Sequence, residues 1–237
     1  MKCEFLNLVY PRRCPICEEV LAPRDKLIHR NCRDQLIFLQ EPKCMRCGKP
    51  IDQAEQEYCF DCNNHMFHYL RGFPCLKYDK RMSKSISSFK YKGKKEFADF
   101  YVSELLGLYE EQFKQLKFDA LIPIPLHSSK YKERGFNQAE MIAKGISQNI
   151  QVPVDTMMLI RTRKTLPQKE LNDKERLRNL EQAFELRIKN QSNGYQKVLL
   201  VDDIYTTGST IEACAKLLVL AGVRDVYYTS ICIGQGY

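Results

Sequence analysis

Residues 198–210 read VLLVDDIYTTGST, and this stretch decides the fold of the chain. Four apolar residues, typical of a buried parallel strand, end at two adjacent acids, Asp202 and Asp203. A turn rich in hydroxyl groups and glycine follows, and residues 211–222, IEACAKLLVLAG, have a helical pattern. In open α/β sheets, ligands bind beyond the carboxyl ends of the strands, which is where these acids fall. The stretch therefore predicts a strand, an anion-binding loop and a helix N-terminus.

The loop after the two acids suits a phosphate group. It offers backbone N–H groups, hydroxyls and the positive end of a helix dipole, and Gly208 lets the backbone close around the anion. Asp202 and Asp203 can accept hydrogen bonds from the hydroxyls of a ribose. The stretch resembles the phosphoribosyl-diphosphate (PRPP) motif of type I phosphoribosyltransferases, and the chain contains no GxxxxGK run of a Walker loop. The predicted 5′-phosphate-binding residues are Thr206, Thr207, Gly208, Ser209 and Thr210.

This resemblance implies a phosphoribosyltransferase-like domain, which we place at residues 67–237. Its fold class is α/β, with a mainly parallel, Rossmann-like sheet and helices on both faces. Residues 119–125, DALIPIP, predict a short buried strand that prolines end. The other predicted elements are a hairpin-like stretch at 69–78, strands near 155–160 and at 225–233, and helices near 82–91, 95–113, 138–148, 173–181 and 209–221, the last capped by Gly222.

A second anion-binding element follows the strand at 119–125. The loop at residues 126–138, LHSSKYKERGFNQ, has the charge and flexibility that suit a diphosphate. Two such loops would hold the two ends of one PRPP molecule, with Mg2+ bridging diphosphate oxygens and ribose hydroxyls. Asn137 is also a suitable helix N-cap, and the two roles are compatible. The predicted diphosphate-binding residues are Lys130, Lys132, Arg134 and Gly135.

Residues 1–66 predict a zinc-binding module. Seven of the eleven cysteines and one histidine form four knuckles whose starts are spaced evenly, and the two ligands of each knuckle lie on one side of a tight turn. Sequential pairing of the knuckles and an interleaved cross-brace use the same eight ligands, and both stay open. Metal binding would supply most of the folding energy of so short a segment, with Zn2+ in a structural role. The predicted ligands are Cys14, Cys17, His29, Cys32, Cys44, Cys47, Cys59 and Cys62.

The charge pattern indicates a nucleic-acid partner for the second domain. Basic and acidic residues cancel in residues 1–62, so the formal net charge of +8 lies in residues 63–237. Residues 77–95 interleave cations with aromatics, as single-stranded nucleic acid requires, although an amphipathic helix with buried aromatics explains the same pattern. A second basic cluster, residues 161–178, has the composition of a phosphate-facing loop, although an ordinary charged loop explains the same composition. The predicted nucleic-acid-binding residues are Lys84, Lys90, Tyr91, Lys92, Lys94 and Lys95.

Neither a signal peptide nor a membrane span is expected. The apolar stretch at the N-terminus is too short for a signal peptide and contains an early acid. No apolar run approaches the roughly 20 residues of a membrane span. We therefore expect a cytoplasmic protein without membrane insertion.

Together these motifs resemble the ComF family of competence proteins, which join an N-terminal zinc finger to a phosphoribosyltransferase-like domain. The resemblance spans FLNLVYPRRCPIC, CMRCG, YCFDC, SFKYKG, PIPLH, RGFNQAE, TLPQKEL and VLLVDDIYTTGST, and RGFNQ after PIPL is its specific marker. The chain departs from the family at His29, where relatives commonly have cysteine. The resemblance implies a role in natural transformation, with single-stranded DNA and a competence helicase as partners.

An active nucleobase phosphoribosyltransferase that uses Mg-PRPP is the alternative function. In that case Asp202 and Asp203 would be the catalytic residues, because they would hold the ribose beside a developing oxocarbenium-like charge. Any hood that stacks the acceptor base would come from residues 63–118, which also contain the basic, aromatic stretch.

Overall fold

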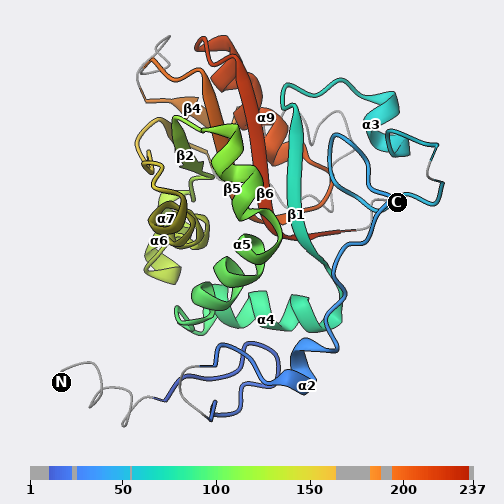
Figure 1. The fold of residues 1–237 in the computed structure, drawn as a ribbon. Helices are drawn as coiled ribbons and strands as arrows, with labels where there is room; N and C mark the ends of the chain where they lie inside the picture. Colours follow the sequence, from blue (N-terminus) through green and yellow to red (C-terminus); the bar gives the residue numbers. More distant parts are fainter. Residues whose placement is uncertain (1–10, 23–25, 54, 164–181, 188–193, 235–237) are drawn as a thin grey trace.

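The centre of the molecule is a four-stranded sheet (Figure 1). The computed structural model describes residues 11–22, 26–53, 55–163, 182–187 and 194–234. The strand order is β1-β6-β5-β2, and all three pairings are parallel. The predicted parallel α/β sheet is therefore confirmed. The strands are β1 (Arg71–Lys77), β2 (Ala120–Pro123), β5 (Lys197–Tyr205) and β6 (Asp225–Ile233).

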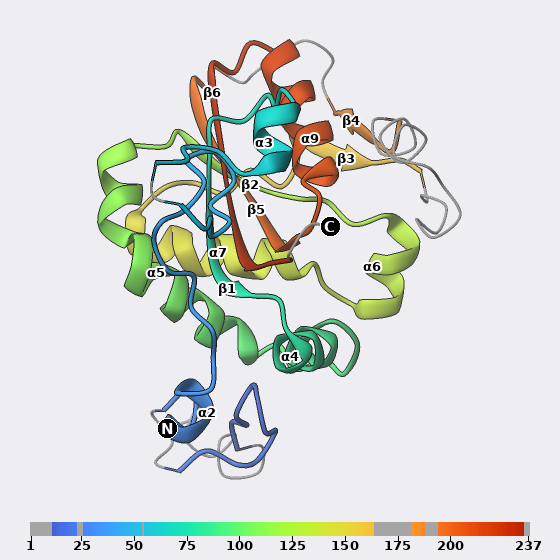
Figure 2. The same ribbon diagram turned by 90° about the vertical axis from the view of Figure 1, so that its right-hand side faces the viewer.

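Helices cover both faces of the sheet (Figure 2). The apolar run of β5 is continuous because its side chains alternate between two buried clusters. Leu199 and Val201 pack with α5 and α7, whereas Val198 and Leu200 pack with α9. Gly145 of α7 lets α5 approach closely, since a Cβ there would lie 2.7 Å from a methyl group of Val102. The helices are α4 (Lys80–Tyr91), α5 (Phe97–Leu116), α7 (Gln138–Ile150) and α9 (Ser209–Leu220).

The two pairs of knuckles lie at different places on the domain. The first pair, with α2 (Arg30–Arg33), packs beside α4 and α5, where Arg33 Nε donates to Glu104 Oε1 at 2.8 Å. The second pair, with α3 (Phe60–Asn64), packs against β6 and α9. The segment between them covers the outer edge of β1, since Phe38 forms an antiparallel bridge with Leu76. This contact protects an edge strand that would otherwise expose unpaired backbone groups.

The expected hairpin at residues 69–78 is wrong, because these residues form the single strand β1. Glycine is common in turns, but Gly72 lies within β1, where it allows a side chain of the neighbouring strand to approach the backbone closely. A Cβ at Gly72 would lie 2.3 Å from the ring of Tyr228 on β6. The strand expected near 155–160 is divided. At its start Val154 forms a parallel bridge with Leu121 of β2, whereas β3 (Leu159–Arg161) pairs antiparallel with β4 (Phe184–Leu186) outside the main sheet.

The expected loop at residues 126–138 contains a short helix, α6 (Ser128–Arg134). The side chain of His127 caps its first turn, and Gly135 ends it with a left-handed φ of 75°. Helix α9 ends one residue earlier than predicted, with Ala221 as its C-cap, and Gly222 follows at a φ of 97°. The helix expected near 173–181 falls outside the described residues. Within the described part of the chain, no helix has both the length and the apolarity to cross a membrane.

Candidate functional site

The two predicted acids lie in a hollow at the carboxyl edge of the sheet. Asp202 and Asp203 lie near the carboxyl end of β5, which continues to Tyr205. Asp203 is buried and Asp202 half-buried. The hollow has a volume of about 250 Å3 and collects side chains from β3, α4, α6, α7 and the segment that follows β2 around the two carboxylates. The elements that the sequence separates therefore meet at one pocket.

The predicted phosphate loop forms a second, smaller hollow beside the first. Its volume is about 20 Å3, and Asp202, Thr206 and Thr210 line both hollows. Gly208 is the N-cap of α9 with a φ of 81°, which a side chain would strain. Because the first turn of a helix leaves backbone N–H groups without intrahelical partners, this loop is arranged to receive an anion. All five residues predicted to bind the 5′-phosphate line it, namely Thr206, Thr207, Gly208, Ser209 and Thr210.

Two of the four residues predicted to bind a diphosphate face the larger hollow. Lys130 and Arg134 lie one turn apart on α6 and line it, whereas Lys132 and Gly135 do not. A helix explains the division, since only every third or fourth residue shares a face. Lys90 of α4 and Arg161 of β3 complete a set of four cations around the two acids.

Lys90 lies in the pocket and not on the outer surface expected of a nucleic-acid-binding residue. Its Nζ lies 2.6 Å from Asp203 Oδ2, and both side chains are largely buried. Burial alone would lower the pKa of Lys90, but the charge of Asp203 and their hydrogen bond raise it overall. Lys90 therefore stays charged and is part of the candidate site.

Unmatched polar groups indicate that the pocket suits an anion. Burial and the charges of Arg161, Arg134 and Lys90 lower the pKa of Lys130, in that order. Two buried atoms, Arg134 Nε and Gln138 Nε2, have no hydrogen-bond partner. An anionic ligand with several oxygens would supply acceptors for both atoms and offset the clustered positive charge. The residues present thus fit the diphosphate end of a phosphorylated sugar. Gln138 was predicted only as the start of a helix.

The environment of Asp202 disfavours the charged form of its carboxyl group. Burial and the neighbouring charge of Asp203 raise its pKa from 3.8 to about 7. Since the folded protein binds this proton more tightly than the unfolded chain does, the free energy of unfolding falls as the pH rises from about 4 to 7, and stays low above pH 7.

Asp202→Asn is therefore expected to stabilise the protein more at pH 8 than at pH 5.5, by about 2 kcal/mol. Asparagine can still accept the hydrogen bond that Asp203 N donates to Asp202 Oδ1. Thermal unfolding without Mg2+ at both pH values measures the difference. An equal gain in Tm at both pH values would contradict the raised pKa.

The eight predicted zinc ligands form two groups in sequential pairing. In each group one ligand atom per residue lies within 4.8 Å of the others, which fits a tetrahedral ion. His29 belongs to the first group, with its Nδ1 3.3 Å from Cys17 Sγ. Gly48 turns the third knuckle back with a φ of 73°. The groups are Cys14, Cys17, His29 and Cys32, and Cys44, Cys47, Cys59 and Cys62.

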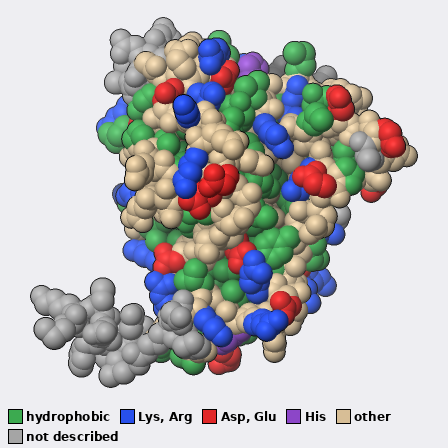
Figure 3. All heavy atoms as spheres, in the orientation of Figure 1, with side chains coloured by type: hydrophobic (Ala, Val, Ile, Leu, Met, Phe, Trp, Pro, Cys, Tyr) green, Lys and Arg blue, Asp and Glu red, His purple; other side chains and the backbone are tan. Residues whose placement is uncertain are grey.

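The other predicted nucleic-acid-binding residues lie on α4 and in the turn after it. The guanidinium carbon of Arg134 lies over the ring of Tyr91, 4.7 Å from the ring centroid. The Tyr91 hydroxyl also accepts a hydrogen bond from Arg134 Nη2. Lys92 Nζ lies 3.3 Å from Oε1 of Glu18, the residue that follows Cys17. Lys84, Tyr91, Lys92 and Lys95 are exposed, and Lys94 is half-buried. On the face drawn in Figure 3, basic and acidic side chains are interspersed.

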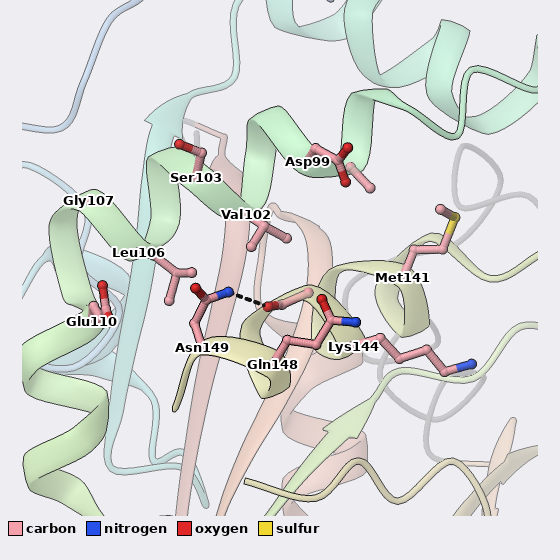
Figure 4. Close-up of a pocket in the computed structure, with 12 residues that line it drawn as sticks. Asp99, Val102, Ser103, Leu106, Gly107, Glu110, Met141, Lys144, Gln148 and Asn149 are labelled. Carbon is pink, nitrogen blue, oxygen red and sulfur yellow. Dashed lines mark hydrogen bonds between the residues drawn. The ribbon is translucent and has the colours of Figure 1, made fainter. Parts of the chain in front are cut away.

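A further hollow of about 580 Å3 lies between α5 and α7 (Figure 4). Its three charged side chains already have partners, each at 2.6 Å: Asp99 pairs with Arg12, Glu110 with Lys114 and Lys144 with Glu140. It contains none of the predicted site residues. The pocket at the two acids, in contrast, brings four cations together around two carboxylates.

Comparisons with known proteins match nearly the whole chain. A family model described as a double zinc ribbon domain matches residues 5–63. Competence protein F of Haemophilus influenzae is 31% identical to the chain, over 83% of the chain and 92% of that protein. Competence protein ComFC of Bacillus subtilis is 28% identical, over 86% and 82%. The DNA utilization protein YhgH of Escherichia coli K12 is 28% identical, over 95% and 98%.

Among solved structures, a purine phosphoribosyltransferase from Pyrococcus horikoshii aligns with 57% of the chain and 83% of its own length. The TM-score is 0.35 and the sequence identity 14%. The α/β fold class follows from the parallel strand order β1-β6-β5-β2 of the chain itself. The zinc ribbon match and the two four-ligand groups together confirm a protein with two zinc sites.

Proposed function

Because this chain belongs to the ComF family, which includes Competence protein F and ComFC, we propose that it handles single-stranded DNA during natural transformation. In this proposal residues 1–66 are a structural zinc module, and residues 67–237 hold a PRPP site beside a nucleic-acid surface. The protein acts in the cytoplasm, where reducing conditions preserve zinc thiolates, together with a competence helicase.

The PRPP part of the proposal is supported by the polarity of the pocket. A hydroxyl-lined loop at a helix N-terminus suits the 5′-phosphate, and the two acids suit the ribose hydroxyls. The unpartnered Arg134 Nε and Gln138 Nε2 suit the diphosphate. Mg2+ would balance part of the charge that such a ligand brings beside Asp202 and Asp203, and would hold diphosphate oxygens. The observation that carries this part is the convergence of four cations and two acids on one hollow.

The DNA part is supported by the exposed lysines of α4 and the following turn. Arg134 joins this surface to the pocket, because its guanidinium contacts Tyr91 while its side chain lines the hollow. Lys95 lies over the ring of Phe136, 5.1 Å from its centroid. Phe136 is buried, so the stacking surface for a single strand would come from the exposed ring of Tyr91, with the lysines supplying charge for the backbone.

We expect Lys→Gln changes at Lys84, Lys92, Lys94 and Lys95 to weaken binding of a single-stranded oligonucleotide. Each phosphate contact that is lost should make the negative slope of log K against log salt less steep by about 0.7. Fluorescence anisotropy at several salt concentrations measures both the affinity and the slope. Lys90 stays unchanged in this variant, because it belongs to the pocket.

The matched control changes Lys114, Lys117, Lys144 and Lys197 to glutamine, which removes the same net charge from other parts of the domain. We expect this control to keep most of the salt slope. If both variants lose the same affinity and salt slope, the effect depends on net charge alone, and the proposed DNA-binding surface is wrong.

A further inference from the structure

Three buried tyrosines lie between the second zinc-binding group and the phosphate loop. The rings of Tyr205 and Tyr228 are stacked, with centroids 4.8 Å apart and planes at 9°. Tyr69 lies edge-on to both rings, and its hydroxyl lies 2.8 Å from that of Tyr205. All three side chains are at most 3% exposed. Such a packed cluster is rigid, because its rings and hydroxyls are fixed together.

One end of this tyrosine cluster holds the zinc knuckle. The hydroxyl of Tyr228 donates to the backbone carbonyl of Cys47, a predicted zinc ligand, at 2.7 Å. Both groups are buried, so the carbonyl depends on this donor for its hydrogen bond. The position of the knuckle and the position of the Tyr228 ring are therefore coupled.

The other end of the cluster supports the phosphate loop. A Cβ at Gly208 would lie 2.3 Å from the hydroxyl oxygen of Tyr205, so that hydroxyl lies directly against the loop backbone. Tyr205 also lines the small hollow of the loop. The loop therefore rests on a ring whose place depends on Tyr228 and Tyr69.

A second contact joins the same zinc ribbon to the start of α9. His68 follows α3, which carries Cys62, and its backbone N–H donates to Glu212 Oε2 at 2.8 Å. The ring Nδ1 of His68 lies 2.5 Å from the other carboxylate oxygen. Glu212 is in the first turn of α9, immediately after the loop, and is buried. Two separate contacts thus connect the ribbon to the two ends of the anion-binding turn.

We propose that the second zinc ribbon positions the phosphate loop, with Tyr228 and Tyr205 as positioning residues and the His68–Glu212 pair as a second support. The ligand side of this inference depends on the proposed PRPP site. Zinc at Cys44, Cys47, Cys59 and Cys62 then sets the order of the loop and, through it, the affinity for a phosphorylated ligand. The first zinc-binding group has no such part, because it packs beside α4 and α5.

The test uses Tyr228→Phe in the full, zinc-loaded chain. This change keeps the stacked ring but removes the donor to Cys47. We expect two zinc ions per chain, as in the wild type, together with faster hydrogen exchange at residues 206–210. Calorimetry should show Mg-PRPP binding about five-fold weaker, the factor that one net hydrogen bond is worth. His68→Ala should act in the same direction through the other contact.

Tyr227→Phe is the matched control. Tyr227 is next to Tyr228 on β6, points to the opposite face of the sheet and packs near Phe73 and Phe118. It should leave both the exchange rates and the affinity unchanged. Unchanged exchange at residues 206–210 in both Tyr228→Phe and His68→Ala would overturn the inference, as would equal effects of Tyr227→Phe and Tyr228→Phe.

Hydrogen exchange separates this inference from the proposed function, because it needs no ligand. If the wild type does not bind Mg-PRPP, the proposed function fails while the exchange result still decides whether the ribbon orders the loop. If the wild type binds and only the exchange rates fail to change, the positioning role is wrong and the PRPP site stands.

Discussion

Cys47→Ala is expected to lower the zinc content from two ions to one and to lower Tm by about 10–15 °C, the largest stability effect that we expect here. Structural zinc contributes directly to folding free energy, so losing it belongs to the few mechanisms that cost roughly 4–5 kcal/mol. For a chain of this size, each kcal/mol changes Tm by about 2–4 °C. All four thiols of the second group are buried, so the remaining three would be left packed together without a metal.

The environment of Cys47 explains why the loss should spread beyond the metal. Its carbonyl accepts from Tyr228, and the following Gly48 packs against Pro74 of β1, where a Cβ would lie 2.6 Å from a ring carbon. The knuckle is thus part of the wall of the sheet. If this knuckle unfolds, Pro74 of the edge strand β1 loses its contact with Gly48.

Cys75→Ala is the matched control for this prediction. Cys75 is as buried as Cys47, each being 1% exposed, but it lies in β1 outside both four-ligand groups. Both variants lose one sulfur atom from a packed interior, and only one loses a metal ligand. Metal analysis and thermal unfolding should separate them. If Cys47→Ala keeps two zinc ions and the two variants unfold at the same temperature, zinc does not stabilise this region.

The core of the fold could be predicted from the sequence because its signals are local. A buried parallel strand reads as an apolar run, and β5, the loop and α9 follow each other without a break. Features that depend on contacts between distant segments could not be predicted. Gly72, for example, suggests a turn in the sequence. Its role is seen only in the structure, where the ring of Tyr228 on the neighbouring strand leaves no room for a Cβ.

Lys90 illustrates the same limit within the candidate site. Its neighbours in sequence are basic and aromatic, as expected for an exposed nucleic-acid surface, whereas its partner Asp203 is far along the chain. The zinc pairing was open for a similar reason, because equal spacing of the knuckles suits both arrangements. The structure has sequential pairing because the segment between the pairs runs along β1 and holds them apart.

Asp203→Asn should weaken the binding of Mg-PRPP by about 10- to 100-fold, because a hydrogen bond to a charged group is worth roughly 1.5–3 kcal/mol. The same change should leave the binding of Mg-pyrophosphate unchanged or strengthen it. Pyrophosphate has no ribose, and the variant removes a negative charge from a hollow that four cations line. The ratio of the two dissociation constants, measured by calorimetry, therefore reports on the sugar alone.

A second variant separates binding from folding. Asp203→Asn leaves the buried ammonium of Lys90 without its carboxylate, which destabilises the protein independently of any ligand. Adding Lys90→Met removes that unpaired charge and should recover much of the Tm, but the weak binding of Mg-PRPP should remain. Equal losses of affinity for Mg-PRPP and Mg-pyrophosphate in the stable double variant would mean that the acids do not hold a ribose. The hollow would then be an anion site without a preference for sugars, and the resemblance of its loop to a PRPP motif would not extend to the ligand.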